Sequence, residues 1–178
     1  PVFAAYARPQ DNLTDQQVDY LNKFVPVGKR ALVNLRRDAI DGVVRGVLAE
    51  DNSGLPGLAN VIANSKRHVE ILALQRGMGN SLAAFPVYPA HVVDNLPDSW
   101  FAGKQVLVGA NLPMQDRYPT SFQALYGLQD GARPGVEIHA HAVANLSGQT
   151  DYRRLGAAGH LPVFLLFSLM ALLAGKSD

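Results

Sequence analysis

The chain has 178 residues, enough for one compact domain with a hydrophobic core and too few for two ordinary domains. Its 16 Lys and Arg residues nearly balance its 15 Asp and Glu residues, so no strong field favours nucleic acid or an acidic membrane surface as a partner. The chain contains no cysteine, which excludes disulfides, cysteine nucleophiles and thiolate metal sites.

The first third of the chain alternates between strand and helix patterns. The apolar run 2–7 predicts a central strand, and because it opens without a turn, a cap or an initiator methionine, it indicates that the chain starts inside a domain. Thr14 and Gln17 stand at the spacing of a capping box, which predicts a short helix. The apolar runs 31–35 and 43–49, separated by a turn that ends in Asp-Gly, predict a β-hairpin.

Four further patterns continue this alternation. Pro56 predicts the start of a helix, and residues 66–76 predict another. The run 105–110 predicts a buried strand. Segment 134–148 opens with Pro-Gly and closes with Gly, which predicts a helix. The alternation favours an α/β domain with a single sheet and helices packed on it.

The C-terminal part of the chain is strongly apolar. The stretch that starts at Leu155 and ends at Gly175 has no formally charged residue, and a bilayer core of about 30 Å needs about 20 helical residues. The stretch therefore predicts a transmembrane helix, with a buried core helix as the alternative. This divides the chain into a domain at 1–150 and a juxtamembrane and membrane segment at 151–178.

Three stretches, in order along the chain, carry a resemblance to a known family. The first is VNLRRDAIDGVVRG, the second is FAGKQVLVGA with DRYPT downstream, and the third is PGVEIHAHAVANLSG. Together they resemble the type-two CHASE family, sensory domains found outside the membrane in bacterial cyclases, histidine kinases and serine/threonine kinases. The matching positions in the first two stretches are Asn34, Asp38, Asp41, Gly42, Arg45 and Asp116.

The resemblance implies that residues 1–150 form an extracytoplasmic sensor domain that lacks its N-terminal part, held at the bacterial cytoplasmic membrane by the helix that follows. Cyclase or kinase activity would lie in an output domain outside this chain, so the chain itself is not expected to be an enzyme. The expected partner is a small-molecule or protein signal of unknown identity. A homodimer stays open, and no cofactor, metal or nucleic acid is expected.

Asp116 and Arg117 are the first candidates for a ligand site. They follow the predicted buried strand 105–110, and ligands of open α/β sheets collect at the carboxyl ends of strands. The pair therefore predicts a signal-binding crevice. The alternative is local, with Asp116 capping a turn or pairing with Arg117.

Asp38 and Arg45 flank the predicted hairpin turn and form a second candidate pair. With Asp41 they could contribute to ligand binding. A polar turn also needs Asp and Gly for its geometry alone, and this structural interpretation is favoured.

Glu137, His139 and His141 pose the sharpest chemical question. On a strand all three would share a face and could bind a metal ion, which would indicate a metal-dependent hydrolase. On the predicted helix, residues two apart point about 200° away from each other, so His139 leaves the group and becomes a core residue. Glu137 and His141 then remain neighbours and a tentative ligand pair. A dimerisation scaffold that senses nothing is the third functional alternative.

Overall fold

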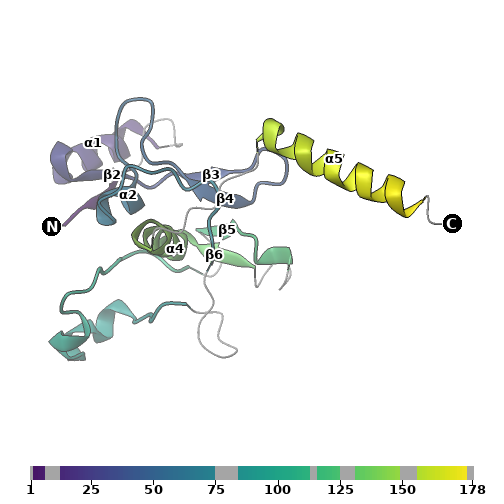
Figure 1. Cartoon of the computed structure of the whole chain (residues 1–178). Coiled ribbons are helices and arrows are strands. Elements are labelled where there is room, and N and C mark those ends of the chain that lie inside the picture. Colours follow the sequence, from purple (N-terminus) through teal and green to yellow (C-terminus); the bar gives the residue numbers. More distant parts are fainter. Residues whose placement is uncertain are drawn as a thin grey trace.

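The computed structural model describes residues 2–6, 13–74, 84–112, 116–124, 131–148 and 156–175 (Figure 1). The α-helices are α1 (Asp15–Phe24), α2 (Leu58–Ile62), α4 (Gly135–Ser147) and α5 (Ala157–Ala174), with short 3-10 helices at Val27–Lys29, Ala90–Asn95 and Asp98–Trp100. The strands are β1 (Ala4–Tyr6), β2 (Arg30–Leu32), β3 (Leu35–Arg37), β4 (Val44–Val47), β5 (Arg117–Pro119) and β6 (Ala132–Pro134).

The strands form three small sheets, which confirms a mixed α/β class and corrects the prediction of a single sheet. In the described residues β1 pairs with β2 in parallel, whereas β3–β4 and β5–β6 are antiparallel pairs. One reason is the proline at the end of both β5 and β6, Pro119 and Pro134, because proline has no amide hydrogen to extend a ladder. Among the described residues strand β1 has β2 as its one neighbour, so the prediction of a central strand at 2–7 is wrong.

The predicted buried strand at 105–110 is wrong. Among the described residues this segment pairs with no strand, and Val106 and Val108 are 57% and 90% exposed. Its backbone instead runs beside α4, where a Cβ on Gly109 would lie 2.7 Å from the Val136 Cβ. An apolar run indicates contact with other apolar residues. Whether that contact is with a neighbouring strand or with a helix depends on the tertiary structure.

The predicted helix start at Thr14 is confirmed. The Gln17 amide donates to the Thr14 hydroxyl over 3.3 Å, and the Thr14 amide donates to the Gln17 side-chain oxygen over 2.8 Å. This reciprocal pair satisfies two amides that a helix leaves without partners at its start. Helix α1 then continues to Phe24.

The predicted hairpin is confirmed, although its first strand begins later than expected, at Leu35 in β3. Gly42 closes the turn with a φ of +70°, which glycine adopts without the steric cost that a Cβ brings. The predicted helix at 66–76 does not form over the described residues 66–74. There Val69 pairs with Val47 by two backbone hydrogen bonds of 3.0 and 3.3 Å, and this long-range pairing overrides the local helix pattern.

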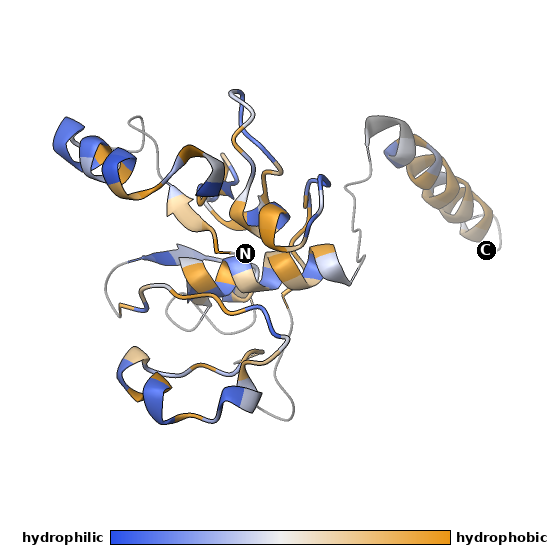
Figure 2. Ribbon diagram, turned by 90° about the vertical axis from the view of Figure 1, so that its left-hand side faces the viewer, coloured by the Kyte–Doolittle hydropathy of each residue, from blue (hydrophilic) through white to orange (hydrophobic). Residues whose placement is uncertain are grey.

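Helix α4 organises the core, and its predicted bounds after Pro134 and before Gly148 are confirmed. Ile138 and Ala142 are completely buried. They pack with side chains from β4, α2 and the segment after it, namely Val44, Val47, Ala59, Val69 and Leu72. Figure 2 shows the hydrophobic residues of α4 beside those of the elements that cover it.

Helix α5 occupies most of the stretch predicted to cross a membrane. Its 18 residues correspond to about 27 Å at a rise of about 1.5 Å. In the part of the chain that the structure describes, no helix has both the length and the apolar character required to traverse a bilayer. The prediction of a transmembrane helix between Leu155 and Gly175 is therefore not supported. The alternative of a buried core helix is wrong, because Phe164 and Phe167 are 72% and 65% exposed.

Candidate functional site

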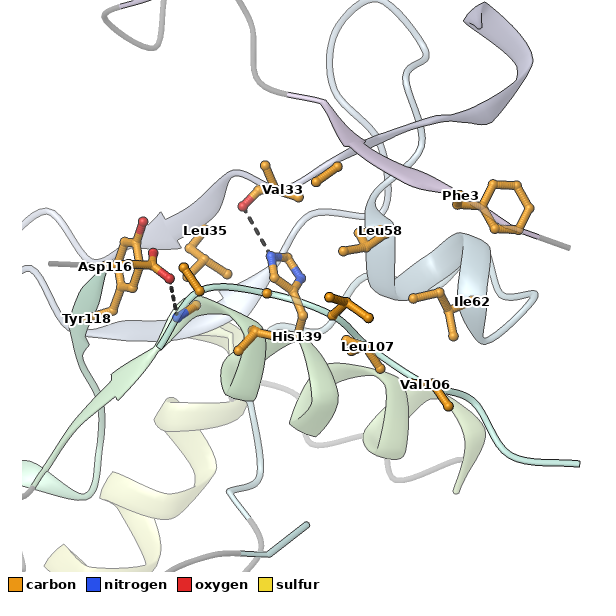
Figure 3. Close-up of a pocket in the computed structure, with 16 residues that line it drawn as sticks. Phe3, Val33, Leu35, Leu58, Ile62, Val106, Leu107, Asp116, Tyr118 and His139 are labelled. Carbon is orange, nitrogen blue, oxygen red and sulfur yellow. Dashed lines mark hydrogen bonds between the residues drawn. The ribbon is translucent and has the colours of Figure 1, made fainter. Parts of the chain in front are cut away.

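A cavity of about 290 Å³ lies beside the first turns of α4 (Figure 3). Its walls come from β1, the β2–β3 connection, α2, the extended segment 106–110 and the start of α4. Most of the lining is apolar, including Phe3, Val33, Leu35, Leu58, Ile62 and Leu107. Three polar side chains also line it: Asp116, Tyr118 and His139.

Asp116 lies at the N-terminus of α4. The Gly135 amide donates to Asp116 Oδ2 over 3.2 Å, so the carboxylate accepts from an amide that the helix leaves without a partner. The positive end of the helix dipole favours a negative charge at this place. A Cβ on residue 135 would lie 3.0 Å from Asp116 Oδ1, so glycine gives the carboxylate room to approach. Asp116 itself has a φ of +52°. Asp116 therefore lines a cavity and caps a helix that is distant in sequence, not the local turn that the alternative interpretation proposed.

Tyr118 connects Asp116 with β3. Burial raises the pKa of the Tyr118 phenol, and the Asp116 carboxylate raises it further by its charge and a hydrogen bond. The Arg37 guanidinium lies 5.0 Å from the centre of the Tyr118 ring and acts on the pKa in the opposite direction. The phenol therefore stays protonated at neutral pH beside the Asp116 carboxylate.

His139 contributes the third polar group, and its predicted place in the core is confirmed by a side chain that is 6% exposed. Its Nε2 lies 3.2 Å from the Val33 carbonyl oxygen. A carbonyl oxygen only accepts, so Nε2 carries the hydrogen and Nδ1 is an acceptor. Burial lowers the pKa of His139 and keeps the ring neutral. Nδ1 is buried and has no hydrogen-bond partner among the described residues.

Arg117 does not join this site. Its guanidinium donates to the Asn111 side-chain oxygen over 2.8 Å and to the Leu112 carbonyl oxygen over 3.2 Å. These bonds tie β5 to the end of the extended segment. The structure thus separates two neighbours that the sequence grouped: Asp116 lines the cavity and Arg117 stabilises its wall.

Glu137 and His141 lie on another face of α4. Glu137 Oε1 is 3.8 Å from His141 Nε2 and 3.5 Å from Arg133 Nε, so the predicted contact between residues four apart is present. The Phe85 ring meets the buried His141 ring edge-on, with 4.9 Å between centroids. His139 is not part of this group. Within the described residues no three metal-ligating side chains converge, which corrects the metal-site arrangement on which the hydrolase alternative depended.

Asp38 and Arg45 hold the hairpin turn and do not line the cavity. Arg45 makes two bonds of 2.7 and 2.6 Å to Asp41 and an ion pair of 3.2 Å with Asp38. Asp41 also accepts from the Val43 amide over 3.0 Å. The Arg45 bonds and this amide hold the pKa of Asp41 at about 2. These contacts agree with the structural interpretation of the turn.

The sequence did not predict three parts of the cavity wall: Tyr118, the Val33 carbonyl and the segment 106–110. Tyr118 carried one usable signal, its position in the DRYPT stretch two residues after Asp116. The Val33 carbonyl had no such signal, because every residue has the same backbone carbonyl group and the sequence does not show which one will meet a side chain.

A mixed α/β domain whose largely apolar cavity contains a few convergent polar groups has the features of a ligand-binding domain. Comparison with known families identifies the family. The chain belongs to the CHASE2 domain family, whose model matches residues 2–175, and this confirms the resemblance in the three sequence stretches. CHASE2 domains are sensor domains and are typically extracytoplasmic. No curated protein and no solved structure matches the chain.

Proposed function

We propose that this chain is the extracytoplasmic sensing domain of a bacterial signalling protein, and that its signal is a small molecule that binds in the cavity at the start of α4. Family membership supports the sensing role. The observation that carries the ligand site is the meeting of Asp116, Tyr118 and His139 in the wall of one apolar cavity. Orientation by a few polar groups within an apolar pocket is the usual construction of a small-molecule site.

The position of the cavity suggests how occupancy would be transmitted. Among the parts of the chain that meet there are β1, α2, the extended segment and α4. A ligand that touches all four favours the arrangement in which they are close together. Binding shifts an equilibrium between two arrangements only by the difference in its affinity for them. The output, a cyclase or kinase activity in the proposed signalling protein, would respond to that shift.

Ligand binding is tested by thermal unfolding of the full chain with a library of small molecules. A ligand at 100 times its Kd stabilises the folded state by about 2.7 kcal/mol. We expect stabilisation of the wild type that is lost in Ala110→Phe, a substitution at an exposed lining residue that fills the cavity. Ala102→Phe is the matched control, because Ala102 is exposed and is not a lining residue. Stabilisation that survives Ala110→Phe would place the ligand elsewhere. Dimerisation that no compound changes, without any stabilisation, would favour the scaffold.

The extracytoplasmic location is tested by labelling in intact cells. The chain has no cysteine, so a thiol introduced at exposed Lys66 would be the only one in this part of the protein. We expect Lys66→Cys to react with a membrane-impermeant maleimide before the cells are opened. Ala142→Cys is the buried control and should react only after denaturation. Labelling of Lys66→Cys only after lysis would overturn the proposed location.

A further inference from the structure

In the described residues the cavity wall has a negative charge without a positive one, and it offers mainly hydrogen-bond acceptors. Of the residues that line it, Asp116 alone carries a formal charge. Burial keeps His139 neutral, its Nε2 donates to the Val33 carbonyl oxygen, and the protonated phenol of Tyr118 lies beside Asp116. Among the described lining side chains there is no cation, and the neutral Tyr118 hydroxyl is the remaining donor.

Two acceptors therefore remain for a ligand. The Asp116 carboxylate accepts from the Gly135 amide, and its two oxygens have room for further donors. His139 Nδ1 has no partner in the described residues and belongs to a side chain that is more than nine-tenths buried. In Figure 3 the ring edge opposite Val33 is turned towards the space beside Ile62 and Leu107. A buried acceptor without a partner is costly, and a donor group on a ligand would remove that cost.

The same wall rejects anions. Helix N-termini often bind anions, but Asp116 already occupies this one at 3.2 Å from the Gly135 amide. A ligand carboxylate or phosphate would meet a like charge in a low-dielectric environment. An ammonium group placed there gains a charge-assisted hydrogen bond.

We propose that the cavity binds a small apolar amine, whose ammonium group is held by Asp116 and whose second N–H or O–H group donates to His139 Nδ1. This inference rests on the proposed function and narrows its ligand to one chemical class. The size is consistent with a single ring, because a cavity of about 150 Å³ holds benzene and this one is about 290 Å³.

Four probes of nearly equal shape test the proposal by titration of the full chain in a calorimeter. Tyramine has the ammonium, the ring and a hydroxyl; tyrosol is its neutral counterpart and 4-hydroxyphenylacetate its anionic one; phenethylamine lacks the hydroxyl. We expect tyramine to bind at least about 10-fold more tightly than tyrosol, since a tenfold ratio needs only about 1.4 kcal/mol. The anion should bind most weakly, and phenethylamine should bind more weakly than tyramine.

Two substitutions assign the contacts. Asp116→Asn should remove the preference for tyramine over tyrosol while retaining the fold, because asparagine is an equally good helix cap. Asp94→Asn is the matched control, since it removes one exposed negative charge far from the cavity lining. His139→Phe should abolish the advantage of tyramine over phenethylamine. If Asp116→Asn fails to fold, the tyramine–tyrosol comparison on the wild type still decides the charge preference.

Each remaining outcome overturns the inference in a recognisable way. Equal binding of tyramine and 4-hydroxyphenylacetate would refute the amine class and leave the cavity as a ligand site. Suppose that none of the probes binds but other compounds stabilise the chain and Ala110→Phe abolishes that stabilisation. This result would also refute the amine class and leave the cavity as a ligand site. Binding by none of the probes and stabilisation by no compound would remove both this inference and the ligand site.

Discussion

Asn145 gives the most direct test of how this fold is held together. The side chain is 1% exposed and lies near the end of α4. Its Nδ2 donates to the Ala73 carbonyl and to the His141 carbonyl, each over 2.8 Å, and its Oδ1 accepts from the Ala73 amide over 2.9 Å. One amide side chain thus pairs with both backbone groups of Ala73, as a neighbouring strand would. We expect its removal to detach the segment after α2 from α4.

The expected cost follows from these three bonds. A hydrogen bond contributes about 1 kcal/mol net, and a buried partner left without one costs about 1–3 kcal/mol. Ala73 is only half-buried, so water replaces part of what it loses. Asn145→Ala should therefore lower the free energy of unfolding by about 2–3 kcal/mol. At about 2–4 °C per kcal/mol for a chain of this size, the Tm falls by about 4–12 °C.

Denaturant and thermal unfolding, followed by circular dichroism, would measure the change in the free energy of unfolding and in the Tm. Asn145→Asp keeps the size and the acceptor but loses both donors, so it should be destabilised at least as much as Asn145→Ala. Asn95→Ala, at an exposed position, is the control and should change stability by less than about 0.5 kcal/mol. If Asn145→Ala and Asn95→Ala are indistinguishable, or if Asn145→Asp matches the wild type, the bonds to Ala73 do not hold the segment.

Three further predictions concern other parts of the molecule. Arg45→Gln should raise the pKa of Asp41 from about 2 towards 3.8, measured by carboxyl NMR titration; an unchanged value would refute the Arg45 contribution. His139 has a folded pKa below its unfolded value of about 6.5, so its contribution to stability is complete above that pH and is lost as the pH falls towards the folded pKa. His139→Gln should flatten the fall in unfolding free energy between about pH 7.5 and 5, whereas His91→Gln, at an exposed site, should not. Ile138→Ala should cost about 2–5 kcal/mol in denaturant unfolding, because the side chain is completely buried; a cost below about 1 kcal/mol would contradict its place in the core.

The parts of the fold that the sequence predicted well depend on neighbours along the chain. The capping box needs only Thr14 and Gln17, three positions apart, and the hairpin turn needs Asp and Gly side by side. Helix α4 is bounded by Pro134 and Gly148, which act through the backbone of the helix that they adjoin. Such signals depend on geometry within a few residues, so they can be recognised without knowledge of the tertiary structure.

The errors occur where a segment depends on a distant partner. The run 105–110 is apolar enough for a buried strand, yet in the described residues it runs along α4 without a ladder. Residues 66–74 favour a helix locally, but hydrogen bonds between Val69 and Val47 keep the backbone extended. Glycine at position 46 allows this approach, because a Cβ there would collide with the Val69 carbonyl oxygen. A local pattern does not contain the energy of such contacts.

The sequence by itself determined family membership, the bounds of α4 and the capped start of α1. It also identified Asp116 as a candidate ligand-binding residue. Tertiary structure alone decided that Asp116 meets the Gly135 amide, that Arg117 turns away, and that His139 reaches a carbonyl 106 positions earlier in the chain. The physical reason is the range of the interactions. Caps and turns are set by bonds between near neighbours, whereas a cavity exists only where remote segments pack without filling the space between them.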